Sequence, residues 1–143
     1  MQFTETNNRY LIRLEKGEEI IKSLTAFCSQ NTIKSGELWA IGAVLSAEIG
    51  FYHLDKKNYS FKQFNTPHEI ASLIGNVALV DGKPFLHIHT VLADENFACV
   101  GGHLKEATVG ATCEVYLTNL DTEINRKFDE EIGLKLLDCK AIP

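Results

Sequence analysis

The sequence has few of the features that mark cross-linked, secreted or membrane-embedded proteins. Its four cysteines lie far apart and form no CxxC pair, so neither a disulfide framework nor a thiolate zinc site is expected. No segment approaches the ~20 consecutive apolar residues of a membrane-spanning helix. The first residues also lack the charged-then-apolar pattern of a signal peptide. We therefore expect a cytoplasmic protein without a membrane partner.

Positive charge is also scarce. The chain has 14 Lys and Arg against 19 Asp and Glu, a formal net charge of −5, and its basic residues are scattered singly or in the pair Lys56-Lys57. Such a chain repels nucleic-acid phosphates at long range. The charge therefore disfavours DNA as a partner.

Proline is rare, and no low-complexity linker or internal repeat divides the chain. The length of 143 residues suits one hydrophobic core. The composition, 45% hydrophobic and 23% charged, is that of an ordinary globular protein. We expect a single domain over residues 1–143.

The apolar pattern predicts an α+β fold built mainly from strands. One helix is expected over residues 18–30, where apolar side chains recur at helical spacing. A strand is expected over residues 9–14, and the stretches 37–54 and 59–64 are typical of strands in a meander.

The second half of the chain contains the clearest hairpin signal. Two apolar runs, residues 69–80 and 84–93, flank an Asp-Gly turn that favours antiparallel pairing. A loop is expected over residues 94–110. The two-residue alternation of 111–120 predicts a further strand, and another strand or a short helix is expected around 128–137.

Three histidines form a candidate metal site. His87 and His89 are two residues apart on a predicted strand, so their side chains point to one face about 6.5–7 Å apart. His103 follows Gly101-Gly102, whose backbone freedom would bring a third ring close. Three neutral imidazoles suit zinc and leave a fourth position open for water or substrate. Iron, manganese, nickel or copper would also accept imidazole ligands, and a polar pair without metal is the simpler alternative.

Other polar residues are weaker candidates. Glu114 lies on the strand predicted over 111–120 and is the candidate catalytic residue, as a general base or as a hydrogen-bond partner of a ligand ring. An outward polar position is its alternative interpretation. His68 is expected at the surface, or paired with Glu69 beside a pocket, and His53 is expected to face solvent.

Several segments, taken in order, resemble the plants-and-prokaryotes conserved (PPC) domain in its stand-alone prokaryotic form. The resemblance covers nearly the whole chain and is carried by RLEKGEEI at 13–20, AIGAVLSAEIGFYHLDKKNY at 40–59, PHEIASLIGNVALVDGKPFLHIH at 67–89, GGHL at 101–104, CEVYL at 113–117, Arg126 and GLKLL at 133–137. It implies an antiparallel sheet of about six or seven strands with flanking helices and a homotrimer. It also implies a metal held by His87, His89 and His103.

The resemblance leaves two classes of function open. The first is a metal-dependent enzyme or small-ligand binder, with hydrolysis of a small polar substrate as the natural chemistry. The second is a DNA-binding or protein-interaction module, because plant members carry AT-hooks and bacterial relatives carry a DNA-binding label. An acidic chain without a basic arm has little with which to neutralise phosphates. A trimer would need to gather Lys56, Lys57 and Lys62 into one patch.

Overall fold

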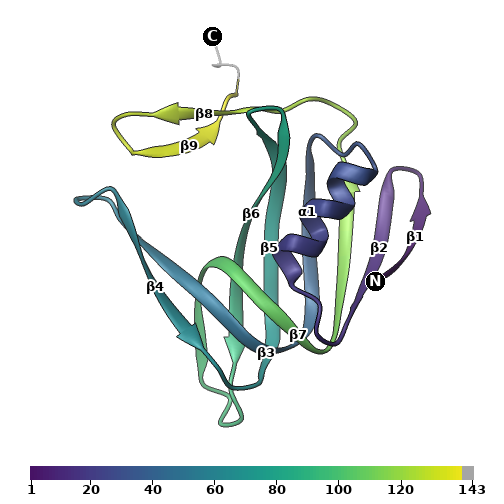
Figure 1. Ribbon diagram of the computed structural model, residues 1–143, viewed down its shortest axis with the longest axis vertical. Coiled ribbons are helices and arrows are strands. Elements are labelled where there is room, and N and C mark those ends of the chain that lie inside the picture. The colour runs from purple at the N-terminus through teal and green to yellow at the C-terminus, as the bar shows by residue number, and fades with distance from the viewer. Residues whose placement is uncertain (140–143) are drawn as a thin grey trace.

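The structure of the protein, a computed structural model, describes residues 1–139 and has one helix and nine strands in that range (Figure 1). In chain order the elements are β1 Gln2–Thr6, β2 Arg9–Glu15, α1 Ile20–Gln30, β3 Gly36–His53, β4 Asn58–Phe64, β5 His68–Val80, β6 Lys83–Ala93, β7 Cys99–Asn119, β8 Arg126–Asp129 and β9 Leu134–Leu137.

Seven of the strands form one antiparallel sheet in the order β1-β2-β7-β6-β5-β3-β4, and β8 pairs with β9 as a separate hairpin. The long strands β3 and β7 also pair with each other. The strands β3, β5, β6 and β7 therefore close into a ring. One face of this sheet points inward to the core and the other points outward.

The core fills the inside of this curved sheet, and α1 covers it by packing against β6 and β7 (Figure 1). The alternating burial of β2 shows the principle: Tyr10, Ile12 and Leu14 are buried while the residues between them are exposed. The helix buries Leu24 and Phe27 against the sheet, as its spacing predicts. Residues between buried strand positions consequently lie on the outer face.

The start of α1 is capped by a residue from a distant strand. Glu19 stands at the N-cap position but makes no side-chain cap. The carboxylate of Glu106 on β7 instead accepts hydrogen bonds from the backbone N–H groups of Ile21 and Lys22, at 2.8 and 3.1 Å. A carboxylate there satisfies free N–H groups and complements the helix dipole. The helix is thus anchored to the sheet at its first turn.

The predicted strands and hairpin are confirmed, and two expectations are wrong. β5 and β6 pair across Asp81-Gly82, both at positive φ as a tight hairpin turn requires. The flanking helices are reduced to α1 among the described residues, because most connections between strands are tight turns. Residues 99–110, expected as a loop, belong to β7, where they pair with β6 and β3. Within residues 1–139, the eleven-residue α1 is too short to cross a bilayer.

Candidate metal centre

The geometry of the site begins with strand alternation in β6. Ile88 points inward and is fully buried, so His87 and His89 on either side of it point to the outer face. Their ring centroids are 5.1 Å apart. The sequence-based placement of this pair is therefore confirmed.

The pairing of β6 with β7 positions the third ring, that of His103. His103 lies directly opposite His89, and directly opposite residues share one face of the sheet. Its ring centroid is 5.3 Å from that of His87 and 5.7 Å from that of His89. One ligand nitrogen from each ring lies within 4.8 Å of the others. A metal at about 2.0–2.1 Å from each nitrogen would draw this triangle in by about an ångström.

Two glycines permit this close arrangement of strands. At Gly75 on β5, a Cβ would contact the carbonyl oxygen of His87 and lie 2.9 Å from Cα of Ile88. At Gly102 on β7, which has φ +157°, a Cβ would lie 2.7 Å from the carbonyl oxygen of Gly50. A side chain at either position would push apart the strands that present the histidines.

Burial keeps two of the rings neutral. Desolvation, with smaller effects of the nearby charge of Arg126 and of the other two rings, lowers the pKa of His87 to about 4. Desolvation, with a smaller effect of His89, also lowers the pKa of His103. At neutral pH both rings are therefore in the unprotonated form that binds metals.

The hydrogen bonding of the rings tests whether a metal fits. Nδ1 of His103 is buried and has no partner among residues 1–139. The two histidines outside the cluster are bonded: His53 to Ser60 at 3.0 Å and His68 to the carbonyl oxygen of Thr66 at 2.7 Å. A buried ring nitrogen without a partner calls for a missing ligand. Three converging imidazoles with this deficit fit a transition metal.

Arg126 is a neighbour of the site that residue spacing did not reveal. Its Nη2 donates a 2.7 Å hydrogen bond to Oδ1 of Asn76, and Asn76 is the cross-strand partner of His87. The contact joins residues 50 positions apart, so no local pattern in the sequence points to it. Tyr59 of β4, which packs its ring 4.9 Å from that of His103, was missed for the same reason.

The remaining candidates lie elsewhere. Glu114 is on β7, eleven residues beyond His103, between Arg13 of β2 and Ile41 of β3, and it is not in the histidine group. The structure does not bring it to the rings. The expectation that His68 is a surface residue is wrong, because it is buried at the start of β5.

Fold and site together define a class of protein: an antiparallel β-sheet domain with a candidate three-histidine metal centre. The sequence profile of the Plants and Prokaryotes Conserved (PCC) domain matches residues 1–121. The chain belongs to this family, which is the PPC family whose motifs it resembles.

Solved structures agree with this assignment. A plant- and prokaryote-conserved (PPC) protein from Pyrococcus horikoshii is 34% identical with a TM-score of 0.89, over 99% of this chain and 97% of that one. A metal-containing protein from Archaeoglobus fulgidus is 40% identical with a TM-score of 0.86, over 95% and 97%. A Bacteroides thetaiotaomicron protein, provisionally named a DNA-binding protein, is 28% identical with a TM-score of 0.93, over 96% of both chains. Among proteins with curated functions, none matches the chain.

Proposed function

We propose that this protein binds one divalent transition metal ion per chain, with zinc as the expected ion, through His87, His89 and His103. The observation that carries the proposal is the convergence of three rings, one of which has a buried nitrogen without a partner. The metal-containing relative from Archaeoglobus fulgidus supports it. Three protein ligands leave a coordination position for a small molecule.

The residues around the rings indicate which kind of ligand would fit the site. A bound zinc ion would supply Lewis acidity at its open position. His87 also borders a pocket with Arg126 and Tyr59, so a small molecule at the metal would meet a fixed positive charge on this side. We propose a small-ligand site or an enzyme acting on a small polar substrate. Within one chain Glu114 is not among the residues of this site, because it lies eleven residues beyond His103 along β7.

We further propose that the protein forms a homotrimer through the outer face of its sheet. Four apolar side chains stand in cross-strand contact on that face, and we call them the apolar row: Leu11, Tyr116, Trp39 and Ile74. All four are at least 40% exposed in a single chain. A contiguous exposed apolar surface marks a protein contact. Burial by further copies of the same chain would remove it from water.

DNA binding, suggested by the names of relatives, receives little support from this chain. The net charge is −5. Two of the three lysines proposed for a basic patch already have partners: Lys57 donates to the carbonyl oxygen of Glu130, and Lys62 lies 5.0 Å from the centre of the Phe64 ring. A salt-dependent mobility shift with duplex DNA at micromolar protein would reverse this view.

The metal content of purified protein tests the main proposal. Untagged protein, prepared without chelators, is analysed for metals beside the His87→Ala/His89→Ala double variant and the matched control His53→Ala. We expect near one metal ion per chain in the wild type and in His53→Ala, and loss of the metal in the double variant. A wild type that takes up no metal after incubation with zinc would contradict the proposal. Retention of the metal in the double variant would contradict it equally.

A further inference from the structure

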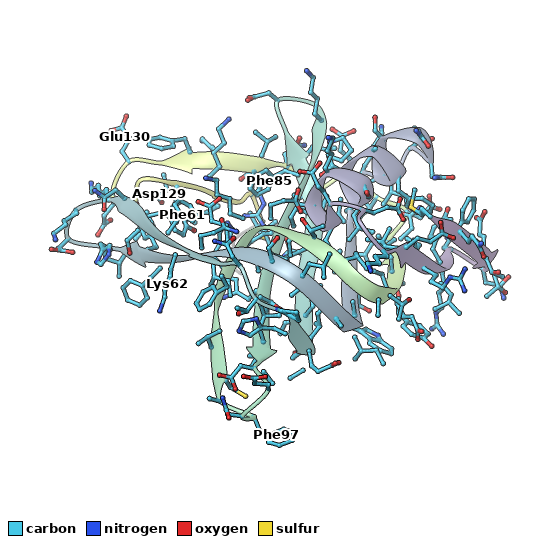
Figure 2. The ribbon with its side chains drawn as sticks, turned by 60° about the horizontal axis from the view of Figure 1, so that its bottom comes forward. Phe61, Lys62, Phe85, Phe97, Asp129 and Glu130 are labelled. Carbon is cyan, nitrogen blue, oxygen red and sulfur yellow. The ribbon has the colours of Figure 1, made fainter. Side chains whose placement is uncertain are left out.

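The β8–β9 hairpin covers one side of the metal centre, like a roof, and contacts the sheet through several hydrogen bonds and an ion pair. The hydroxyl of Tyr52 donates a hydrogen bond to the carbonyl oxygen of Ile132 at 2.6 Å. Nζ of Lys57 donates to the carbonyl oxygen of Glu130 at 2.7 Å. Lys135 pairs with Asp81 in the β5–β6 turn at 2.7 Å. In Figure 2, Asp129 and Glu130 mark the turn of this hairpin and Phe85 lies beside it. The roof is therefore a fixed part of the fold.

A pocket of about 450 Å³ lies under this roof, and we call it the Arg126 pocket. Its volume is in the range of small-molecule sites. The residues that give it a mainly apolar wall are Val80, Phe85, Phe128, Leu134 and Leu136. Arg126, Tyr59 and two metal-site residues, His87 and His103, supply polar groups. A ligand here would bury an apolar body and place a polar group beside the metal centre.

The guanidinium of Arg126 is held rigidly in this pocket. Nη2 donates to Asn76 at 2.7 Å and Nη1 donates to the carbonyl oxygen of Lys135 at 3.0 Å. The group also lies 5.4 Å from the ring centre of Phe85, which is two residues before His87 on β6. Because Phe85, His87 and the partner of His87, Asn76, all lie on the outer face, the charge sits next to the His87 ring.

Among the residues that the structure describes, this positive charge has no opposite charge to pair with. No carboxylate of residues 1–139 lies within 4.0 Å of Arg126, and its Nε is buried without a hydrogen-bond partner in that range. Two of the five N–H bonds of a guanidinium are used, which leaves three. Desolvation lowers the pKa of Arg126, which shows that burial opposes its charge. A half-buried, unpaired cation of this kind is stabilised by an anion.

We propose that the Arg126 pocket binds a small carboxylic acid with an apolar body, whose carboxylate pairs with Arg126 beside the metal centre. The apolar wall selects against a strongly hydrated inorganic anion and matches a short hydrocarbon chain. The fork of N–H groups matches the two oxygens of a carboxylate. Contact of this acid with a bound metal rests on the proposed function. Pairing of its carboxylate with Arg126 does not depend on a metal.

The experiment compares an acid with its neutral amide by isothermal titration calorimetry at pH 7. The probes are 4-methylpentanoate, 4-methylpentanamide, acetate and inorganic phosphate. We expect zinc-loaded wild type to bind 4-methylpentanoate at least about tenfold more tightly than the amide, acetate or phosphate. Arg126→Gln should weaken binding of the acid by about tenfold to a hundredfold and leave the amide unchanged. The exposed neighbour Lys127, changed to Gln, is the charge-matched control and should leave both unchanged.

Equal binding of acid and amide by the wild type would overturn the inference, and this comparison needs no variant to fold. An acid preference that survives in Arg126→Gln, with a thermal melt like the wild type, would also overturn it. Metal-stripped wild type separates the two proposals. An Arg126-dependent acid preference in a protein that takes up no metal supports the pocket while the metal site fails. Stoichiometric metal binding without an acid preference supports the metal site and overturns the proposal for the Arg126 pocket.

Discussion

Trp39 and Tyr116 lie directly opposite each other in β3 and β7, and their rings stack with centroids 4.0 Å apart and planes 7° from parallel. The cross-strand pairing continues from Trp39 to Ile74 and from Ile74 to His89. The apolar row and the metal centre are therefore neighbours on one outer face. The strand β5, through Ile74, therefore contacts both the apolar row and the strand that carries His89.

Disruption of the apolar row should dissociate the trimer. Ile74 is 58% exposed and stands between Trp39 and His89, so Ile74→Lys places a charge in the proposed contact without a change to the core. We expect monomers at micromolar concentration by size-exclusion chromatography with light scattering.

The control for this test is Phe97→Ser. Phe97 is 88% exposed at the tip of the β6–β7 loop, at the opposite end of the molecule from the β8–β9 hairpin (Figure 2). It should stay trimeric. A wild type that is monomeric at micromolar concentration would refute the trimer.

Zinc should stabilise the folded chain. Metal that binds only the folded state at one hundred times its dissociation constant adds about 2.7 kcal/mol to the free energy of unfolding. Differential scanning calorimetry should show a higher Tm with zinc and a return after chelation. His103→Ala should abolish the shift while His53→Ala keeps it. An equal shift in His103→Ala would show that zinc binds elsewhere.

Gly75→Ala should weaken metal binding as well as stability. The new Cβ would contact the backbone of β6 at His87 and Ile88, with a loss of roughly 1–3 kcal/mol in the free energy of unfolding. It would also displace the strand that carries two ligands, so zinc affinity measured by chelator competition should fall.

Gly82→Ala provides the matched comparison. A Cβ at Gly82 meets nothing within 4 Å, but φ is +76°, so a loss of about 1–2 kcal/mol is expected from the backbone alone. Zinc affinity should not change. If Gly75→Ala binds zinc as well as Gly82→Ala does, the spacing of β5 and β6 does not control the site.

Cysteine labelling should divide the four thiols into two classes. Burial raises the pKa of Cys28 and of Cys113 to about 12, so both remain protonated and unreactive at pH 8. Cys99 and Cys139 are exposed. Peptide mapping after iodoacetamide treatment of native protein should show label on the exposed pair. Equal labelling of Cys28 without denaturant would mean that α1 opens readily from the sheet.

The sequence by itself determined the features that depend on neighbouring residues. The spacing of apolar side chains specifies the face of α1 that enters the core. The two-residue period of β6 directs His87 and His89 to one side with Ile88 inward. The turn at Asp81-Gly82 sets the pairing of β5 with β6. These features are local, because the regular geometry of a helix or strand fixes the side to which each side chain points from its position along the chain.

Only the tertiary structure decided how distant segments meet. The register of β7 against β6 places His103 opposite His89, although residues 99–110 were expected to form a loop. The same long strand carries Glu114 away from the rings. Docking of the β8–β9 hairpin brings Arg126 to Asn76 and His87. Such contacts depend on packing between segments tens of residues apart, which a local period does not encode. The position of Arg126 beside the His87 ring follows from that packing alone.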